Sequence, residues 1–158
     1  VVFAGAYEDT DVVDAVTAAF NDIIAEQHAD GGPAGDHFGT PGATDRIIAA
    51  CEDEGLPLLP GAATASDIMA LLERGFTVQK FFPAEQAGGA AYLKSIGSPI
   101  PQVSFCPTGG ISLKIAPDYL ALKNILCVGG SWVAPKDKML AGDWAGITAL
   151  AREAAGLR

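Results

Sequence analysis

The sequence is poor in positive charge. Its 158 residues include 10 lysines and arginines against 19 aspartates and glutamates, which gives a formal net charge of −9. This balance argues against a surface that binds the phosphates of nucleic acid and against a polybasic membrane anchor. The sequence also lacks any run of about eighteen or more apolar residues, and its first six residues lack the charged and long apolar regions of a signal peptide. We therefore expect a cytoplasmic protein that binds neither nucleic acid nor membrane.

Cysteine and histidine are also scarce. The three cysteines, Cys51, Cys106 and Cys127, are far apart in the sequence and lie in apolar surroundings. Such a pattern predicts buried thiols rather than a disulfide or a metal site. His28 and His37 lie in a segment rich in glycine and aspartate and have no neighbouring ligand pattern. We therefore expect exposed loop histidines and no bound metal.

Hydrophobic residues make up 49% of the chain, enough for one sizeable core and one domain, residues 1–158. From residue 38 onward, apolar runs, turns and helix-like stretches alternate, whereas residues 1–37 are atypical. Expected strands are 56–60, 77–83, 103–107 and 125–129. Expected helices are 88–96, 116–122, 144–155, one from Thr44 or Asp45 to Glu54, and one from Ser66 or Asp67 to Arg74, with Gly55 and Gly75 as stops. In the first part, we expect a strand at 1–6, a helix at 11–26 and a loop at 27–37.

This alternation of strands and helices predicts a parallel α/β sheet, either open or closed as a barrel. Glycines and functional side chains follow several of the expected strands, and the carboxyl ends of the strands are where a (β/α)8 TIM barrel builds its site. The barrel is therefore the favoured fold. Because such barrels begin at about 200 residues, we expect this chain to lack or poorly represent the first one or two β/α units.

Lys80 is the one charged residue in an otherwise apolar, strand-like run at 77–83. A buried ammonium loses hydration and shifts toward the neutral amine, which is a nucleophile able to form a Schiff base with a carbonyl substrate. The alternative is a lysine near a strand end whose head group reaches water. The segment alone leaves both interpretations open.

Two glycine-rich turns follow the last two expected strands, Thr108-Gly109-Gly110 and Gly129-Gly130-Ser131. Paired glycines let backbone N–H groups approach an oxyanion, hydroxyl groups add donors, and a following helix N-terminus adds positive potential. In a barrel, these positions form the common phosphate site. The spacing of a nucleotide-binding loop is absent, and Ser131 does not lie in the turn of a serine hydrolase.

Four ordered motifs resemble the 2-keto-3-deoxy-6-phosphogluconate (KDPG) aldolase family, the class I aldolases of the Entner–Doudoroff pathway. The motifs are Lys80-Phe81-Phe82-Pro83-Ala84-Glu85, Pro107-Thr108-Gly109-Gly110-Ile111, Val128-Gly129-Gly130-Ser131-Trp132 and Gly142-Asp143-Trp144. The resemblance runs from about residue 38 to the carboxyl terminus and includes Thr40-Pro41-Gly42. It implies a homotrimeric barrel without a cofactor, in which Lys80 forms the Schiff base. It also implies that the two turns hold the substrate phosphate and that Thr108 helps to orient the aldehyde half.

The amino-terminal part departs from this pattern. Family members carry a general acid/base glutamate and a carboxylate-binding arginine in a Glu-Val-Thr-x-Arg-like motif, and this sequence has no such motif. If residues 1–7 are laid on the family's third strand, Ala6 stands where a substrate-contacting threonine belongs. We expect that the first two β/α units are absent from this chain or that its first third is altered. A carboxylate such as Glu8, Glu26 or Glu85 would then have to act as the acid/base.

Two classes of function remain. The first is an aldolase that cleaves KDPG to pyruvate and glyceraldehyde 3-phosphate, with 2-keto-4-hydroxyglutarate (KHG) cleavage as the close variant. The two turns favour the phosphorylated substrate. The second is a non-catalytic trimeric scaffold or fragment of the same fold, which the missing acid/base motif favours and the retained Lys80 disfavours.

Overall fold

The structure, a computed structural model, describes residues 38–157. The strand expected at 1–6, the helix at 11–26 and the loop at 27–37 lie outside the described residues. So do both histidines, Ala6, Glu8 and Glu26.

The strands are short and all pair in parallel. They are β1 (Phe38–Gly39), β2 (Leu58–Leu59), β3 (Gly61–Ala62), β4 (Val78–Phe81) and β5 (Ser104–Pro107). Only Pro60 separates β2 from β3, so these two strands form one extended run with β1 on one side and β4 on the other. The Lys80 N–H donates to the Pro60 carbonyl at 2.8 Å, and the Thr40 N–H donates to the Leu59 carbonyl at 3.2 Å. The strands at 77–83 and 103–107 are confirmed at their centres.

The strand expected at 125–129 is present only as two isolated bridges. Phe105 pairs with Ile125, twenty positions later, whereas Thr108 pairs with Gly129, twenty-one positions later. The register therefore gains one residue between the two bridges, which interrupts a regular ladder as a bulge does. The segment still lies in the expected place, beside β5.

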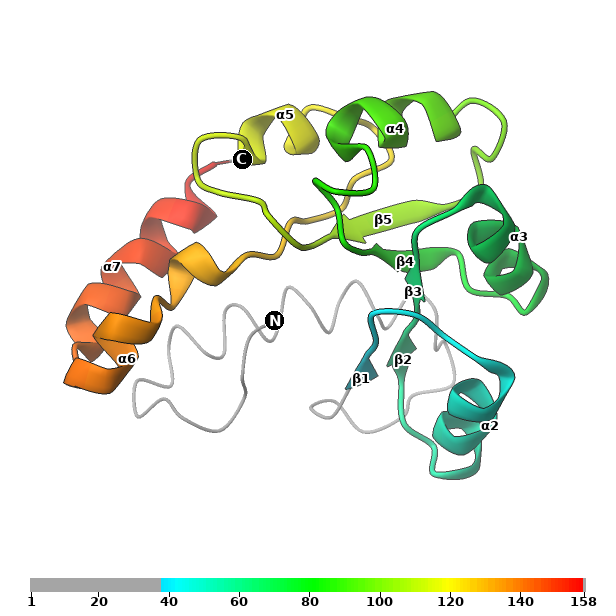
Figure 1. Cartoon of the computed structure of the whole chain (residues 1–158), viewed down its shortest axis with the longest axis horizontal. Coiled ribbons are helices and arrows are strands. Elements are labelled where there is room, and N and C mark those ends of the chain that lie inside the picture. The colour runs from blue at the N-terminus through cyan, green and yellow to red at the C-terminus, as the bar shows by residue number, and fades with distance from the viewer. Residues whose placement is uncertain (1–37, 158) are drawn as a thin grey trace.

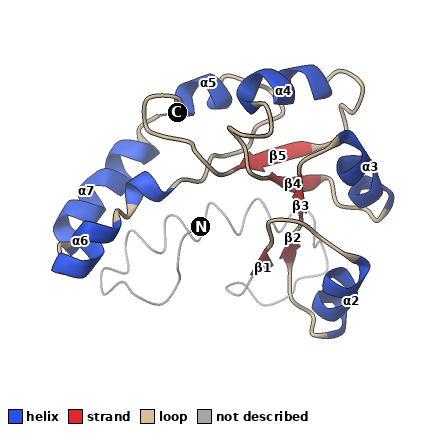
Figure 2. Cartoon of the chain, in the orientation of Figure 1, coloured by secondary structure: helices blue, strands red, loops and turns tan. Residues whose placement is uncertain are grey.

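The helices are α2 (Asp45–Asp53), α3 (Ala65–Glu73), α4 (Gly89–Ile96), α5 (Ala116–Leu120), α6 (Lys136–Ala141) and α7 (Trp144–Ala155), with a 3-10 turn η1 (Ser131–Val133). Figure 1 shows α3, α4 and α5 along one side of β4 and β5, and α6 and α7 together at one end. Figure 2 shows the same separation of blue helices from red strands. None of the helices in residues 38–157 is long and apolar enough to span a bilayer.

The helix ends follow the predicted signals with one correction. Thr44 caps α2, and Gly55 and Gly75 follow α2 and α3 at φ +63° and +90°. The cap of α3 is Thr64, so the prediction of Ser66 or Asp67 is wrong. Asp67 instead completes a capping box, because its carboxylate accepts from the Thr64 N–H at 2.9 Å while its own N–H donates to the Thr64 hydroxyl.

The two faces of the strands have different surroundings. Phe81 and Phe105 pack among buried residues of α2, α3, α4 and α5 in the main core. Lys80 is paired in register with Cys106, and both belong to the opposite face, because side chains alternate along a strand. A small cluster of Leu59, Val78 and Cys106 lies on that face. Consecutive parallel strands with helices on the outside are the architecture of a TIM barrel, and the described residues form part of one.

Candidate active site

Lys80 is buried on the inner face of β4, with 7% of its surface exposed. Burial lowers the pKa of its ammonium, and the neighbouring Cys106 opposes this with a smaller electrostatic effect. The Nζ atom lies 5.3 Å from the centroid of the Phe82 ring. Neither of the two salt bridges found in residues 38–157 involves Lys80.

This burial argues against the interpretation that the Lys80 head group reaches water. A lowered pKa increases the fraction of neutral amine at a given pH, and the neutral amine is the form that attacks a carbonyl carbon. The inner strand face therefore holds a buried amine whose lowered pKa is the property that an attacking lysine needs. Residues 38–157 contain no group of three or more His, Cys, Asp or Glu side chains that could hold a metal ion.

The first glycine turn directly follows β5. Gly109 and Gly110 have φ values of +102° and +79°, which other residues rarely adopt. A Cβ atom on Gly109 would lie 3.1 Å from the Phe82 ring, and one on Gly110 would lie 2.8 Å from the Cβ of Glu85. Conformation and space both disfavour a side chain at these positions, and Gly109 packs against the aromatic ring that lies next to the Lys80 Nζ atom.

The second glycine turn lies beside the first. The Thr108–Gly129 bridge joins them, and the Gly129 N–H donates to the Pro107 carbonyl at 2.9 Å. Gly130 is extended, and a Cβ atom there would overlap the Trp132 ring, at 1.7 Å from Cζ3. The structure thus brings together the two turns that the sequence analysis paired. Trp132 packs against the core and against Gly130.

Several donors at these turns have no partner within the described chain. The N–H groups of Gly109, Gly110 and Gly130 donate to no acceptor among residues 38–157. The Thr108 hydroxyl is buried and has no hydrogen-bond partner among residues 38–157, whereas Ser131 is exposed. Clustered N–H groups of this kind are suited to an oxyanion.

Neither glycine turn is followed directly by the N-terminus of an α-helix, although the sequence led us to expect one. Within residues 38–157, the next helix after Gly110 is α5, which begins only at Ala116. After Gly130 comes η1, which has three residues. A single 3-10 turn aligns too few peptide dipoles to add much positive potential. The donors, not a helix dipole, make the turns attractive to an anion.

Glu85 lies next to the first turn but faces the helices. Its carboxylate accepts a short hydrogen bond from the hydroxyl of Tyr119 in α5, and its N–H donates to the Gly109 carbonyl at 3.1 Å. Burial, this hydrogen bond and the negative charge of Glu85 raise the pKa of Tyr119. Since Lys80 projects from the other strand face, this arrangement does not favour Glu85 as an acid/base for Lys80.

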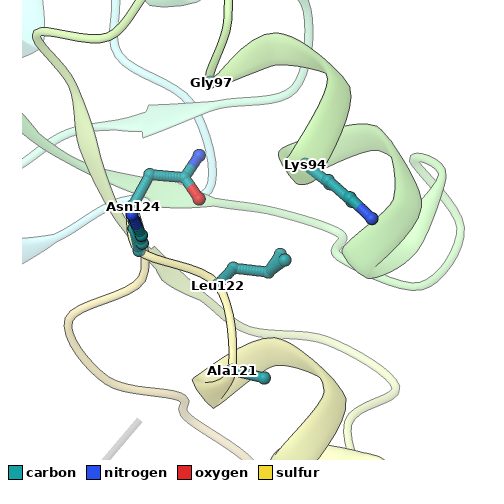
Figure 3. Close-up of a pocket in the computed structure, with 6 residues that line it drawn as sticks. Lys94, Gly97, Ala121, Leu122 and Asn124 are labelled. Carbon is teal, nitrogen blue, oxygen red and sulfur yellow. The ribbon is translucent and has the colours of Figure 1, made fainter.

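A separate pocket of about 290 Å³ lies between α4 and the loop after α5 (Figure 3). Its lining comprises Lys94, Gly97, Ala121, Leu122, Lys123 and Asn124, none of which was a predicted site residue. Asn124 directly precedes Ile125, so the pocket is at the amino-terminal end of that segment, opposite to the glycine turns. The Asn124 amide donates to the Leu93 carbonyl at 2.9 Å, which ties the loop to the end of α4.

Sequence reasoning missed two neighbours of Lys80, namely Cys106 and the Phe82 ring. Phe82 directly follows β4, two residues after Lys80, and this spacing was a usable signal. The position of Cys106 depends on the register between β4 and β5, which the sequence does not state. Cys106 also contacts Cys127, with 3.0 Å between the sulfur atoms, a proximity that their separation in sequence did not predict.

The model of a protein family described as KDPG and KHG aldolase matches residues 6–150. The chain belongs to this family. It is 46% identical over 145 residues to the 2-dehydro-3-deoxy-phosphogluconate aldolase of Dickeya dadantii, covering 91% of this chain and 68% of that protein. It is 50% identical over 115 residues to the enzyme of the same name from Pseudomonas aeruginosa, covering 73% and 52%. The KHG/KDPG aldolase of Escherichia coli K12 is 45% identical, covering 91% and 68%.

Solved structures of KDPG aldolases share the fold. The enzyme from Zymomonas mobilis superposes with a TM-score of 0.72 at 48% identity, covering 78% of this chain and 58% of that one. A Legionella pneumophila KDPG aldolase, with pyruvate captured as a covalent carbinolamine intermediate, gives 0.71 at 43% identity, covering 73% and 56%. The chain spans about half to two thirds of the length of these relatives.

Proposed function

We propose that this chain provides the Schiff-base half of a class I aldolase that cleaves KDPG to pyruvate and glyceraldehyde 3-phosphate. The observation that carries the proposal is the burial of Lys80, whose lowered pKa favours the neutral amine. Membership of the aldolase family and the covalent pyruvate adduct of the Legionella relative support it.

In the proposed reaction, the Lys80 amine attacks the C2 carbonyl of the keto acid, and loss of water gives a protonated imine. As the C4 hydroxyl gives its proton to water or another base, the C3–C4 bond breaks and the imine accepts its electrons, so glyceraldehyde 3-phosphate leaves and an enamine of pyruvate remains on the lysine. Protonation and hydrolysis then release pyruvate. These steps need no metal or organic cofactor.

The two glycine turns are proposed to hold the phosphate. Gly109, Gly110 and Gly130 would supply N–H donors, and the hydroxyls of Thr108 and Ser131 would add to them. Gly129 would contribute the turn geometry, because its N–H already donates to Pro107. Thr108 also lies two residues after Cys106, on the strand face of Lys80, which suits a residue that orients the aldehyde half.

The KHG variant of the reaction is the second candidate, because the Escherichia coli relative carries both names. KHG carries a carboxylate at C5 where KDPG carries a phosphate on C6, so its second anion lies nearer the bond that breaks and offers two oxygens instead of three to the donors of the glycine turns. The turns therefore favour KDPG. The homotrimer, the single domain and the cytoplasmic location stay predictions.

A scaffold without activity is the alternative from another class. It rests on the absence of the Glu-Val-Thr-x-Arg-like motif from the sequence. A positioned general acid/base contributes about 10²–10⁴-fold. We therefore propose that the 158-residue chain forms the imine but turns KDPG over slowly.

The test is kcat/KM for cleavage of KDPG and of KHG by this chain, by Lys80→Met and by Lys94→Met, a control at an exposed lysine of α4. We expect slow cleavage that prefers KDPG, unaffected by the Lys94 change and lost on the Lys80 change. Preference for KHG would reassign the substrate. If Lys80→Met cleaves KDPG as fast as the unchanged chain does, the proposed role of Lys80 is refuted.

A further inference from the structure

Two cysteines that the proposed reaction does not use lie next to each other. The sulfur atoms of Cys106 and Cys127 are 3.0 Å apart. Cys106 belongs to β5, and Cys127 lies between the two bridges that join β5 to the 125–129 segment. Neighbouring strands lie about 4.7–4.9 Å apart, and a disulfide spans about 4.4–6.8 Å between Cα atoms. The two thiols can therefore be joined with little movement of the backbone.

We propose that Cys106 and Cys127 form a reversible oxidation site, which a small disulfide such as oxidised glutathione converts into a disulfide bond beside Lys80. The thiolate of one cysteine attacks a sulfur of the reagent, so that a mixed disulfide forms and one glutathione thiolate leaves. The second cysteine attacks the protein sulfur of the mixed disulfide and expels the other glutathione. The protein loses two electrons and two protons, and the reagent gains them as two thiols.

The surroundings of the two thiols set the order of these steps. Cys106 is 2% exposed, and its contact with Cys127 together with burial raises the pKa of its thiol well above the ordinary value. Cys127 is only partly buried. The reagent therefore reacts first at Cys127, and Cys106 completes the bond because it is adjacent, not because it is acidic.

The disulfide would alter the surroundings of Lys80. Cys106 is the register partner of Lys80 on the neighbouring strand. Closing the sulfur separation from 3.0 Å to about 2.05 Å moves the sulfurs together by about 1 Å. A misplacement of about 1 Å can cost about 10²-fold in rate. We expect oxidation to slow imine formation at Lys80, and this part of the inference rests on the proposed function.

The cross-link is tested by exposing the protein to oxidised glutathione, blocking remaining thiols and mapping peptides without reduction. The unchanged chain and Cys51→Ala should both give a peptide pair joined through Cys106 and Cys127. Cys51 is a matched control, because it is buried in α2 on the helical side. A glutathione adduct that persists without this link, or a link that includes Cys51, would overturn the proposal.

The effect on Lys80 is read from the rate at which borohydride traps pyruvate. Oxidised protein should react at least several-fold more slowly, and dithiothreitol should restore the rate. Cys127→Ala should show no change on oxidation. If the cross-linked protein traps pyruvate as fast as the reduced protein does, the proposed effect of the disulfide on Lys80 is wrong. Reduced protein that traps no pyruvate would contradict the proposed function. The test of the cross-link is independent of that result, because peptide mapping detects the disulfide without any reaction at Lys80.

Discussion

Replacement of Gly109 by alanine probes the contact between the first glycine turn and the ring over Lys80. At φ +102°, an alanine is strained, and its Cβ would lie 3.1 Å from the Phe82 ring and 3.2 Å from Pro83 Cα. The ring and the turn must therefore move apart by a few tenths of an ångström. The change disturbs the proposed phosphate donors and the surroundings of Lys80 together.

The matched control is Gly75→Ala. Gly75 follows α3 at φ +90°, with no atom within 4 Å of the added Cβ, so alanine there suffers backbone strain alone. Such strain costs about 1–3 kcal/mol at either position. At about 2–4 °C per kcal/mol for a chain of this size, both variants should melt several degrees lower, and Gly109→Ala should lose somewhat more.

Phosphate binding separates the two variants. Loss of one hydrogen bond to a charged group costs about 1.5–3 kcal/mol, which corresponds to about tenfold or more in affinity. We expect Gly109→Ala to weaken binding of inorganic phosphate by about that factor in calorimetry and to raise KM for KDPG. Gly75→Ala should leave both unchanged. If folded Gly109→Ala binds phosphate as the unchanged chain does, the assignment of this turn to the phosphate is wrong.

Two further predictions follow from the pKa directions. Lys80→Met should raise the free energy of unfolding near neutral pH, because burial holds the folded pKa of Lys80 below its ordinary 10.5. Between the folded pKa and 10.5 the unfolded chain binds more protons than the folded chain, so the gain in stability should shrink as pH rises through this range. A gain in stability that does not vary with pH would contradict the lowered pKa. Tyr119→Phe should lower the free energy of unfolding by about 1 kcal/mol in urea titration, because the hydrogen bond to the exposed Glu85 is lost. Since the pKa of Tyr119 is raised in the folded state, this difference should narrow above the ordinary pKa of 10.0, and an unchanged difference there would refute the coupling.

Local signals in the sequence were sufficient for much of the fold. The helix expected at about 144–155 is present as Trp144–Ala155, where the Asp143 side chain caps its start. Lys80 was predicted in an apolar strand and is buried in one. The helix Lys136–Ala141 was missed because it has six residues and none of them is buried, so no apolar periodicity marks it.

The candidate site was predictable as far as general rules of parallel sheets apply. The carboxyl ends of neighbouring strands meet at one edge, which placed Thr108 beside Gly129 in advance. Features that depend on register were not predictable. The approach of Cys106 to Lys80, the register change before Gly129 and the hydrogen bond from Tyr119 to Glu85 all depend on how separate elements pack.

Lys80 is the residue that we propose bonds covalently to the keto acid. The most direct test is to incubate the protein with pyruvate, reduce with borohydride and locate the added mass by peptide mapping. We expect a pyruvate-derived adduct on the peptide that contains Lys80 and none in Lys80→Met. An adduct on Lys94 or Lys114, or no adduct on any lysine of the folded protein, would contradict it.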